Sequence, residues 1–300
     1  MLPTFVIIGA QKSSSSFMQR CLADHPEIYL PEGETSFFES PDYEQSKIAE
    51  LEQIFIGRNE KCLGIKRPNY IGKPEVPARI QAHLPEAKLI AVLRSPVDRA
   101  ISAYFHYMKD GFIPLLDPEL GIRRIINDPS FGSQYKRAAE IIEFGYYYKY
   151  LSQYSPYLSS DRLLVFLFED IVARPLASVR RAYEFLGVAP DFIPNSLNSR
   201  PQRVVYNLTR IRLLSYRNRF MYSYNRERTR VFPKEMTTAE KILVKLITGV
   251  DRLLLAKFLS NNKPQIGLPT RQMLYDLYAS DLAFLADFID RDLSAWKPRR

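Results

Sequence analysis

Phe5-Val6-Ile7-Ile8-Gly9-Ala10-Gln11-Lys12-Ser13-Ser14-Ser15-Ser16-Phe17 is the stretch that decides the fold. Its four successive apolar residues, 5–8, predict a strand that is covered on both faces, as in a parallel sheet. Serine is a good N-cap residue, and apolar residues recur at helical spacing from Phe17 to Leu22, so a helix is expected to begin within the serine run. The stretch therefore predicts a buried strand, a turn and a helix.

The turn between this strand and this helix is a candidate anion site. A helix N-terminus presents unpaired N–H groups and the positive end of a dipole, and Lys12 adds a charge. The residues expected to contact a phosphate are Gln11, Lys12, Ser13, Ser14, Ser15 and Ser16. A serine-rich surface turn with a solvated lysine would explain these local residues equally well.

Length and composition indicate one folded domain. With 300 residues and 46% hydrophobic content, the chain can bury a substantial core. We expect a single domain over 1–300, with its core in 4–188 and a basic, helical elaboration in 195–300. No apolar run reaches the roughly 18 residues of a membrane span, and no secretory leader is visible, which predicts a cytoplasmic protein. Cys21 and Cys62 fall in a predicted helix and strand, as free thiols of a reducing compartment do.

The net charge of +9 is unevenly distributed. Residues 1–150 hold 18 Lys+Arg and 19 Asp+Glu, whereas the segment 199–234 alone holds ten basic residues and one acid, Glu227. Such a segment indicates an anionic ligand, an acidic acceptor or a membrane surface, or else a solvated arm of low order. Nucleic acid is not favoured, because no zinc-finger spacing, RNP-type motif or internal repeat accompanies the charge.

Further strands follow the first one at regular intervals. Apolar runs predict a short strand at 27–30 and buried strands at 61–66, 87–93 and 162–168, with helices between them. This alternation predicts an α/β fold: a three-layer α/β/α, P-loop-like domain with a central parallel sheet and extra helices in the C-terminal third. Lys66 and Arg94 stand where strands end, the edge at which ligands bind in such sheets, although ordinary strand-end cations occur there too.

The turn after the first strand departs from the nucleotide triphosphate loop, which needs G-x-x-x-x-G-K-[ST]. It resembles instead the 5′-phosphosulfate loop, K-x-G-T-[ST], of sulfotransferases that use 3′-phosphoadenosine 5′-phosphosulfate (PAPS). Lys12, Ser15 and Ser16 match this loop, and Ser14 stands where the family usually has glycine. Glycine there would ease a left-handed backbone or a close approach of the ligand.

Three further motifs carry the same resemblance. Glu34 matches the glutamate of E-x-x-F-F, the proposed base on the acceptor, and Lys66 matches the lysine of G-x-K-[ST]-P-x-Y, with Arg67 in place of a small hydroxyl residue. The spacing from Arg94 to Ser102 matches the R-x7-S element that holds the 3′-phosphate, the most specific match in the chain. The resemblance implies in-line displacement at sulfur, with Lys12 and Lys66 stabilising charge.

The C-terminal third resembles the family more loosely. Arg200 and Arg203 match the position of a basic loop that closes over PAPS phosphates in many relatives. An amphipathic helix is expected over 242–259, where core or dimer packing is favoured over membrane contact, and a last helix over 269–296. The expected partner is a small-molecule or carbohydrate acceptor, bound by a monomer or homodimer. No metal is expected, because no cluster of His, Cys and carboxylates has ligand spacing.

Two other functions compete with sulfuryl transfer from PAPS to a hydroxyl or amine. A P-loop kinase is disfavoured by the displaced Lys12 and by the R-x7-S element. A non-catalytic protein that binds anions or a membrane surface through its basic segment is supported by the departures from the family pattern at Ser14, at Arg67 and at Ser36, where some relatives have histidine.

Overall fold

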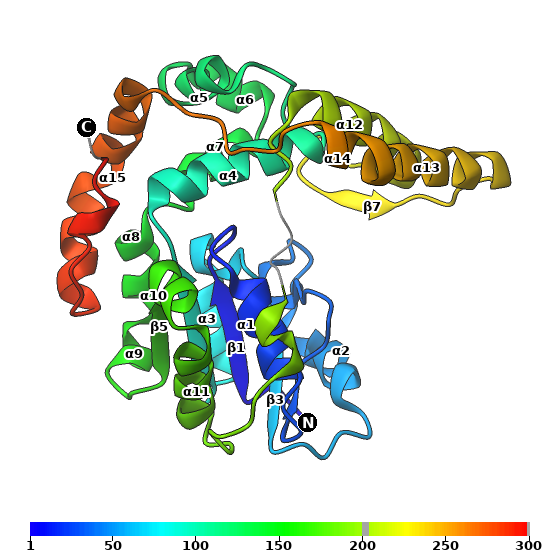
Figure 1. The fold of residues 1–300 in the computed structure, drawn as a ribbon. Coiled ribbons are helices and arrows are strands. Elements are labelled where there is room, and N and C mark those ends of the chain that lie inside the picture. The colour runs from blue at the N-terminus through cyan, green and yellow to red at the C-terminus, as the bar shows by residue number, and fades with distance from the viewer. Residues whose placement is uncertain (200–203, 299–300) are drawn as a thin grey trace. The chain divides into compact units, whose positions relative to one another are not determined.

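A five-stranded parallel sheet forms the centre of the fold (Figure 1). The computed structural model describes residues 1–199 and 204–298. The sheet has the strand order β2-β3-β1-β4-β5 and is flanked by helices, so the predicted α/β class is confirmed. Its strands are β1 (Phe5–Gly9), β2 (Ile28–Tyr29), β3 (Cys62–Lys66), β4 (Lys88–Leu93) and β5 (Leu163–Leu167).

The central strand β1 is buried along its whole length, as its uninterrupted apolar run predicts. Ile7 pairs with Lys66 of β3 on one side and with Ile90 of β4 on the other. At the end of β1, a Cβ on Gly9 would lie 2.5 Å from the side chain of Ile71, so only glycine fits there. The chain can therefore turn away from the sheet close to the segment that follows β3.

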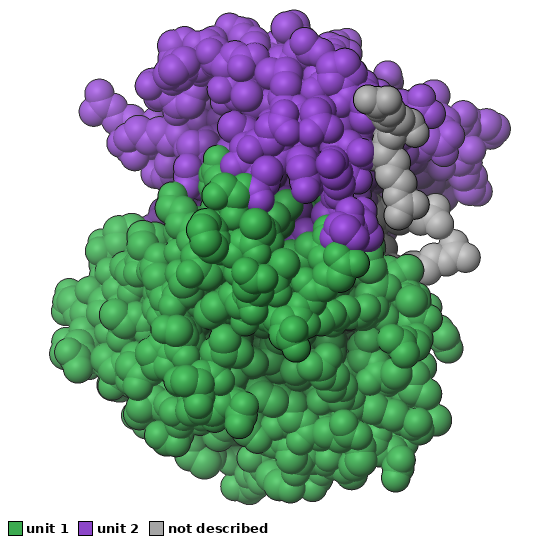
Figure 2. All heavy atoms as spheres, turned by 90° about the vertical axis from the view of Figure 1, so that its left-hand side faces the viewer, with its two compact units in different colours: residues 1–95, 146–201, 280–293 green, residues 96–145, 202–279, 294–300 purple. Residues whose placement is uncertain are grey.

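Two compact units make up the chain, and Figure 2 colours them separately. The first consists of described residues within 1–95, 146–201 and 280–293, and it contains the parallel sheet. Its helices are α1 (Ser15–Ala23), α2 (Ile48–Glu52), α3 (Val76–His83), α8 (Tyr147–Leu151), α9 (Ser155–Leu158), α10 (Phe168–Ala173) and α11 (Pro175–Leu186). One core cluster joins apolar side chains of β1, α1, β4, β5 and α11. Helix α11 ends at Gly187, which adopts a left-handed φ of 80°, as C-terminal glycines of helices commonly do.

The second unit consists of described residues within 96–145, 202–279 and 294–300. Its core gathers apolar side chains of α4 and its neighbours. The elements are α4 (Pro96–Lys109), α5 (Pro118–Asn127), α6 (Pro129–Gln134), α7 (Ala138–Glu143), α12 (Leu208–Met221), β6 (Tyr222–Tyr224), β7 (Val231–Pro233), α13 (Thr238–Val250), a π-helical turn (Asp251–Leu255) and α14 (Ala256–Phe258). The prediction of one domain over 1–300 stays a prediction.

The last long helix, α15 (Leu268–Phe288), is shorter than the predicted 269–296. Asp290 takes a left-handed φ of 49°, and the N–H of Arg291 donates to the carbonyl of Ala286, which closes the helix as a Schellman motif does. A short 3₁₀ turn, Ser294–Trp296, follows separately.

The basic segment is folded where the structure describes it. Residues 208–221 form α12, and β6 and β7 pair antiparallel, so the alternative of a poorly ordered arm is wrong for 204–234. Cys21 and Cys62 are buried free thiols in α1 and β3. Within residues 1–199 and 204–298, no helix has both the length and the apolar character to cross a membrane.

Candidate active site

The turn from β1 to α1 contains two residues in left-handed conformation, Lys12 with a φ of 65° and Ser14 with a φ of 73°. This region costs an L-residue roughly 1–2 kcal/mol, and glycine occupies it freely. Ser14 is the N-cap of α1 and makes no side-chain capping bond. The serine at the usual glycine position therefore adopts the conformation for which glycine is suited.

Two further serines of the turn, and Gln11 before them, have different surroundings. Ser13 is fully buried, and its hydroxyl has no hydrogen-bond partner among the described residues. Ser15 is buried in the first turn of α1, where backbone N–H groups lack intrahelical acceptors. Gln11 donates from Nε2 to Oδ1 of Asn69 at 3.5 Å. An orphaned buried hydroxyl beside a helix N-terminus fits a site for an anionic group.

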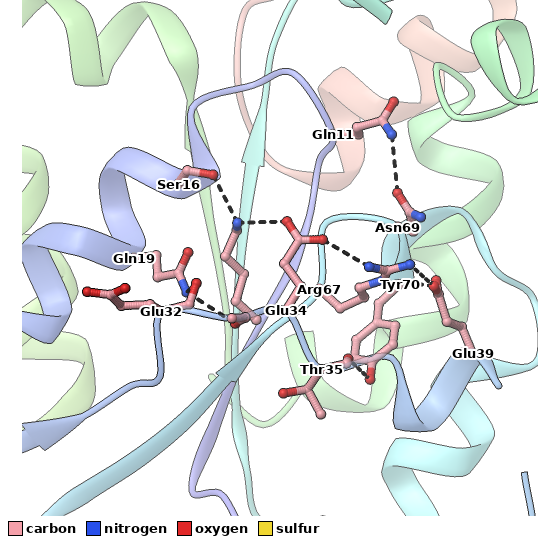
Figure 3. Close-up of polar contacts among 12 residues, drawn as sticks. Gln11, Ser16, Gln19, Glu32, Glu34, Thr35, Glu39, Arg67, Asn69 and Tyr70 are labelled. Carbon is pink, nitrogen blue, oxygen red and sulfur yellow. Dashed lines mark hydrogen bonds and ion pairs between the residues drawn. The ribbon is translucent and has the colours of Figure 1, made fainter. Parts of the chain in front are cut away.

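Lys66, the last residue of β3, is 2% exposed and brings two predicted site residues together (Figure 3). Its Nζ donates to Ser16 Oγ at 2.9 Å and to Glu34 Oε1 at 3.1 Å. Burial lowers the pKa of Lys66, although the carboxylate of Glu34 opposes that shift. The predicted turn, base and strand-end lysine thus form one polar cluster.

Arg67 is a site residue whose role the sequence reasoning missed. It donates from Nη1 to Glu34 Oε2 at 3.0 Å and from Nε to Glu39 Oε1 at 2.7 Å (Figure 3). Burial would lower the pKa of Arg67, but the carboxylates of Glu39 and Glu34 together outweigh burial and the pKa is raised, so the guanidinium stays charged. Both oxygens of Glu34 therefore accept hydrogen bonds from cations. The sequence held one sign of this role, because Arg67 stands where the resembled motif has a small hydroxyl residue.

The segment that carries Glu34 is held from both sides. On one side, Gln19 of α1 donates from Nε2 to the carbonyl of Pro31 at 2.7 Å. On the other side, the N–H of Thr35 donates to the carbonyl of Lys66 at 3.0 Å, and the hydroxyl of buried Tyr70 donates to the carbonyl of Thr35 (Figure 3). These bonds position the carboxylate next to Lys66 without any regular helix or strand.

Arg94, the residue that follows β4, has different contacts from those of Lys66. It donates from Nη1 to the carbonyl of Lys12 at 3.2 Å, and its guanidinium carbon lies 4.6 Å from the ring centroid of Phe168. Tyr147 donates from its hydroxyl to the carbonyl of Arg94 at 2.9 Å, which holds the backbone. Among the described residues no carboxylate forms an ion pair with Arg94.

The predicted partner of Arg94 lies on α4 in the other compact unit. Ser102 is 1% exposed, and its hydroxyl has no hydrogen-bond partner within the described part of the chain. The joint role of Arg94 and Ser102 stays a prediction. Arg200 and Arg203 lie outside the described residues.

Comparison with known proteins decides the family. The model of the sulfotransferase domain matches residues 2–241, which is most of the chain. The chain belongs to the sulfotransferase family. This match confirms the predicted family. Ser16, Glu34 and Lys66, which form the polar cluster described above, lie inside the matched residues.

Two curated relatives are similar over part of their length. The human bifunctional heparan sulfate N-deacetylase/N-sulfotransferase 2 is 30% identical over 202 residues, which cover 63% of this chain and 22% of that protein. The mouse heparan sulfate glucosamine 3-O-sulfotransferase 3A1 is 29% identical over 191 residues, which cover 62% of this chain and 46% of that protein. The sulfotransferase described here thus matches less than half the length of either.

A solved structure matches the whole chain. The sulfotransferase from Alicyclobacillus acidocaldarius has a TM-score of 0.67 and 24% identity, and the match covers 99% of this chain and 100% of that one. At this identity the likeness supports the fold alone. In the described ranges, no group of three or more His, Cys, Asp and Glu side chains is arranged to hold a metal ion.

Proposed function

We propose that this sulfotransferase moves a sulfuryl group from PAPS to a hydroxyl or amine of a small-molecule or carbohydrate acceptor, leaving adenosine 3′,5′-bisphosphate. The observation that carries the proposal is the position of Lys66 Nζ, 2.9 Å from Ser16 Oγ and 3.1 Å from Glu34 Oε1. A buried cation therefore joins a hydroxyl of the anion-binding turn to a carboxylate that can receive a proton.

Each member of this cluster has a role that its chemistry supports. A cation fixed in a buried site stabilises negative charge as it develops during transfer, which suits Lys66 at the sulfuryl group. Lys12 is assigned to the leaving phosphate oxygen, by resemblance to the family. Glu34 is assigned the proton of the acceptor, because a carboxylate within hydrogen-bond reach can accept it while the oxygen or nitrogen attacks.

The nucleotide is assigned to the turn 11–16 and to Arg94 and Ser102. An arginine can bind a phosphate through two parallel N–H donors, and Arg94 has no carboxylate partner among the described residues that would compete. The hydroxyls of Ser13 and Ser102, which have no partner among the described residues, could each donate a further hydrogen bond to a phosphate oxygen of the nucleotide. Roles for Arg200 and Arg203 at PAPS phosphates are retained from the resemblance alone.

The acceptor is proposed at the level of chemical class. The names of both relatives refer to heparan sulfate, which favours a carbohydrate among the acceptors proposed for this chain. Location in the cytoplasm and assembly as a monomer or homodimer stay predictions.

Calorimetry tests the nucleotide, and a transfer assay tests the reaction. We expect adenosine 3′,5′-bisphosphate to bind in preference to ATP, and incubation with PAPS and carbohydrate acceptors to give products heavier by one sulfuryl group. Preference for ATP would support the kinase alternative. Binding of neither nucleotide would exclude both enzymes and leave the non-catalytic alternative.

A further inference from the structure

An apolar face is exposed on the helical segment from α13 to α14. Six large apolar side chains along it are each more than 40% exposed, and Phe258 reaches 80%. They are Ile242, Leu246, Val250, Leu253, Leu254 and Phe258. Five of the six line one shallow surface groove, so they share a single side of the segment. A contiguous exposed apolar face of this kind marks an interaction site.

The opposite side of the same segment is already used inside its unit. Ile247 is buried, and Asp251 accepts a bidentate pair of bonds from Arg210 of α12, with Nε to Oδ1 at 2.8 Å and Nη2 to Oδ2 at 3.0 Å. Figure 1 shows α13 running alongside α12. Because this pairing fixes the rotation of the helix, the apolar face is directed outward by the fold.

Positive charge surrounds the exposed face. Four basic residues of the segment, Lys241, Lys245, Arg252 and Lys257, are exposed, and none of them forms an ion pair with a described residue. Lys245 lines the groove itself. Residues 204–258 carry 12 basic and 4 acidic residues, which accounts for an excess of eight in a chain of net charge +9. The occupant of this face must therefore be both apolar and anionic.

We propose that this face docks on an anionic lipid bilayer. The six exposed apolar side chains would enter the boundary between headgroups and acyl chains. The flanking cations would bind lipid phosphates, as in interfacial amphipathic helices. A second copy of this chain fits less well, because a symmetric contact through the face would bring the unpaired cations of both copies together. A dissolved polyanion would leave the apolar side chains exposed.

Vesicle sedimentation with the full chain tests the proposal. We expect binding to phosphatidylcholine vesicles that contain about 30% phosphatidylglycerol, weak binding to phosphatidylcholine alone, and loss of binding as salt rises from about 0.1 M to about 0.5 M. Equal binding to both vesicle types, or binding to neither, would overturn the proposal.

Two sets of substitutions separate the apolar and the electrostatic contributions. Leu246→Gln with Leu253→Gln should weaken binding to the anionic vesicles at least tenfold. Lys241→Gln, Lys245→Gln and Arg252→Gln together should weaken it by on the order of a hundredfold and abolish the preference for phosphatidylglycerol. The matched control is Leu120→Gln, because Leu120 is also largely exposed, at 53%, but belongs to another helix, α5. That control should bind as the unaltered chain does.

Two measurements distinguish the other occupants. Sedimentation velocity should show no concentration-dependent dimer. A dimer that is lost in the double variant Leu246→Gln, Leu253→Gln would show that the face binds a second copy of the chain, and would overturn the proposal. A polyanion would be indicated if heparin bound the protein while the apolar variants bound vesicles normally, and this too would overturn the proposal. Far-UV circular dichroism and retained binding of adenosine 3′,5′-bisphosphate show that each variant is folded.

Discussion

Lys66 ends β3 and Arg94 directly follows β4, the two strands that flank β1, but the surroundings of these two cations differ. Lys66 is buried, donates to Ser16 and is paired with Glu34, whereas Arg94 donates to one backbone carbonyl and has no carboxylate partner among the described residues. An incoming anion must share Lys66 with Glu34, but it meets an uncompensated charge at Arg94. We therefore expect Arg94 to contribute mainly to nucleotide affinity and Lys66 mainly to the rate of transfer.

The largest effect is expected for Arg94→Ala. Loss of a charged, bidentate donor should weaken binding of adenosine 3′,5′-bisphosphate by about 100- to 1,000-fold. Arg94→Lys, which keeps the charge but not the planar pair of donors, should recover only part of the affinity. Titration calorimetry measures both variants. Unchanged affinity in Arg94→Ala, with the melting temperature retained, would show that the 3′-phosphate is bound elsewhere.

Lys66→Ala is expected to act on turnover. Removing a fixed cation from the site of charge development should lower kcat by about 100- to 1,000-fold, with a smaller change in nucleotide affinity. Steady-state kinetics and calorimetry separate the two effects. If the variant lost affinity as severely as Arg94→Ala while kcat was kept, the contrast between the two strand ends would be wrong.

The pH dependence of kcat sharpens the same contrast. Burial lowers the pKa of Lys66 below its ordinary value of 10.5, and only the protonated amine stabilises negative charge. Activity should therefore fall, as pH rises, at a lower pH than an ordinary lysine would give. In Lys66→Arg the guanidinium stays charged, so this alkaline limb should move upward. An alkaline limb unchanged in Lys66→Arg would belong to another group.

Arg67→Ser removes the guanidinium that pairs with Glu34 and Glu39, and we expect its effect on the stability of the fold. The substitution leaves the carboxylate of Glu39, whose side chain is 10% exposed, without its cationic partner. We expect a loss of about 2–4 kcal/mol in the free energy of unfolding. Arg58→Ser is the control, since Arg58 pairs with Glu60 at 3.6 Å with 43% of its side chain exposed, and should cost under about 1 kcal/mol. Equal losses in chemical denaturation would show that the network adds nothing.

The smallest effect is expected for Ser14→Gly. Glycine removes the cost of a left-handed residue, roughly 1–2 kcal/mol, and adds freedom to the unfolded chain, roughly 0.5–1 kcal/mol, so a net gain between zero and about 1.5 kcal/mol is expected. Ser159, with a φ of −63°, is the control, because glycine there should destabilise. Thermal unfolding of both variants measures the difference, and a loss of stability in Ser14→Gly would contradict the assigned conformation.

Sequence reasoning worked best where a pattern has one physical cause. The run Phe5–Ile8 predicted a central strand because four apolar residues in succession must be covered on both faces. The end of the last helix was predicted too late, because the left-handed turn at Asp290 carries no glycine to mark it.

Long-range pairing could not be predicted in this way. Arg67 contacts Glu34 and Glu39, which lie 33 and 28 residues away, and no local pattern sets such a register. Which side of α13 is exposed could not be predicted either, because amphipathic spacing distinguishes two faces of a helix but does not say which one the fold covers.

The sequence by itself determined the family, the parallel sheet and the identity of the strand-end cations, because apolar runs, spacing and motif residues are properties of the chain. Only the tertiary structure decided which of those cations is neutralised, that Ser14 takes the backbone conformation of a glycine, and that Ile242, Leu246 and Leu253 remain exposed. The reason is physical: charge compensation and burial depend on distances in space, and only folding brings residues far apart in the chain within reach of one another.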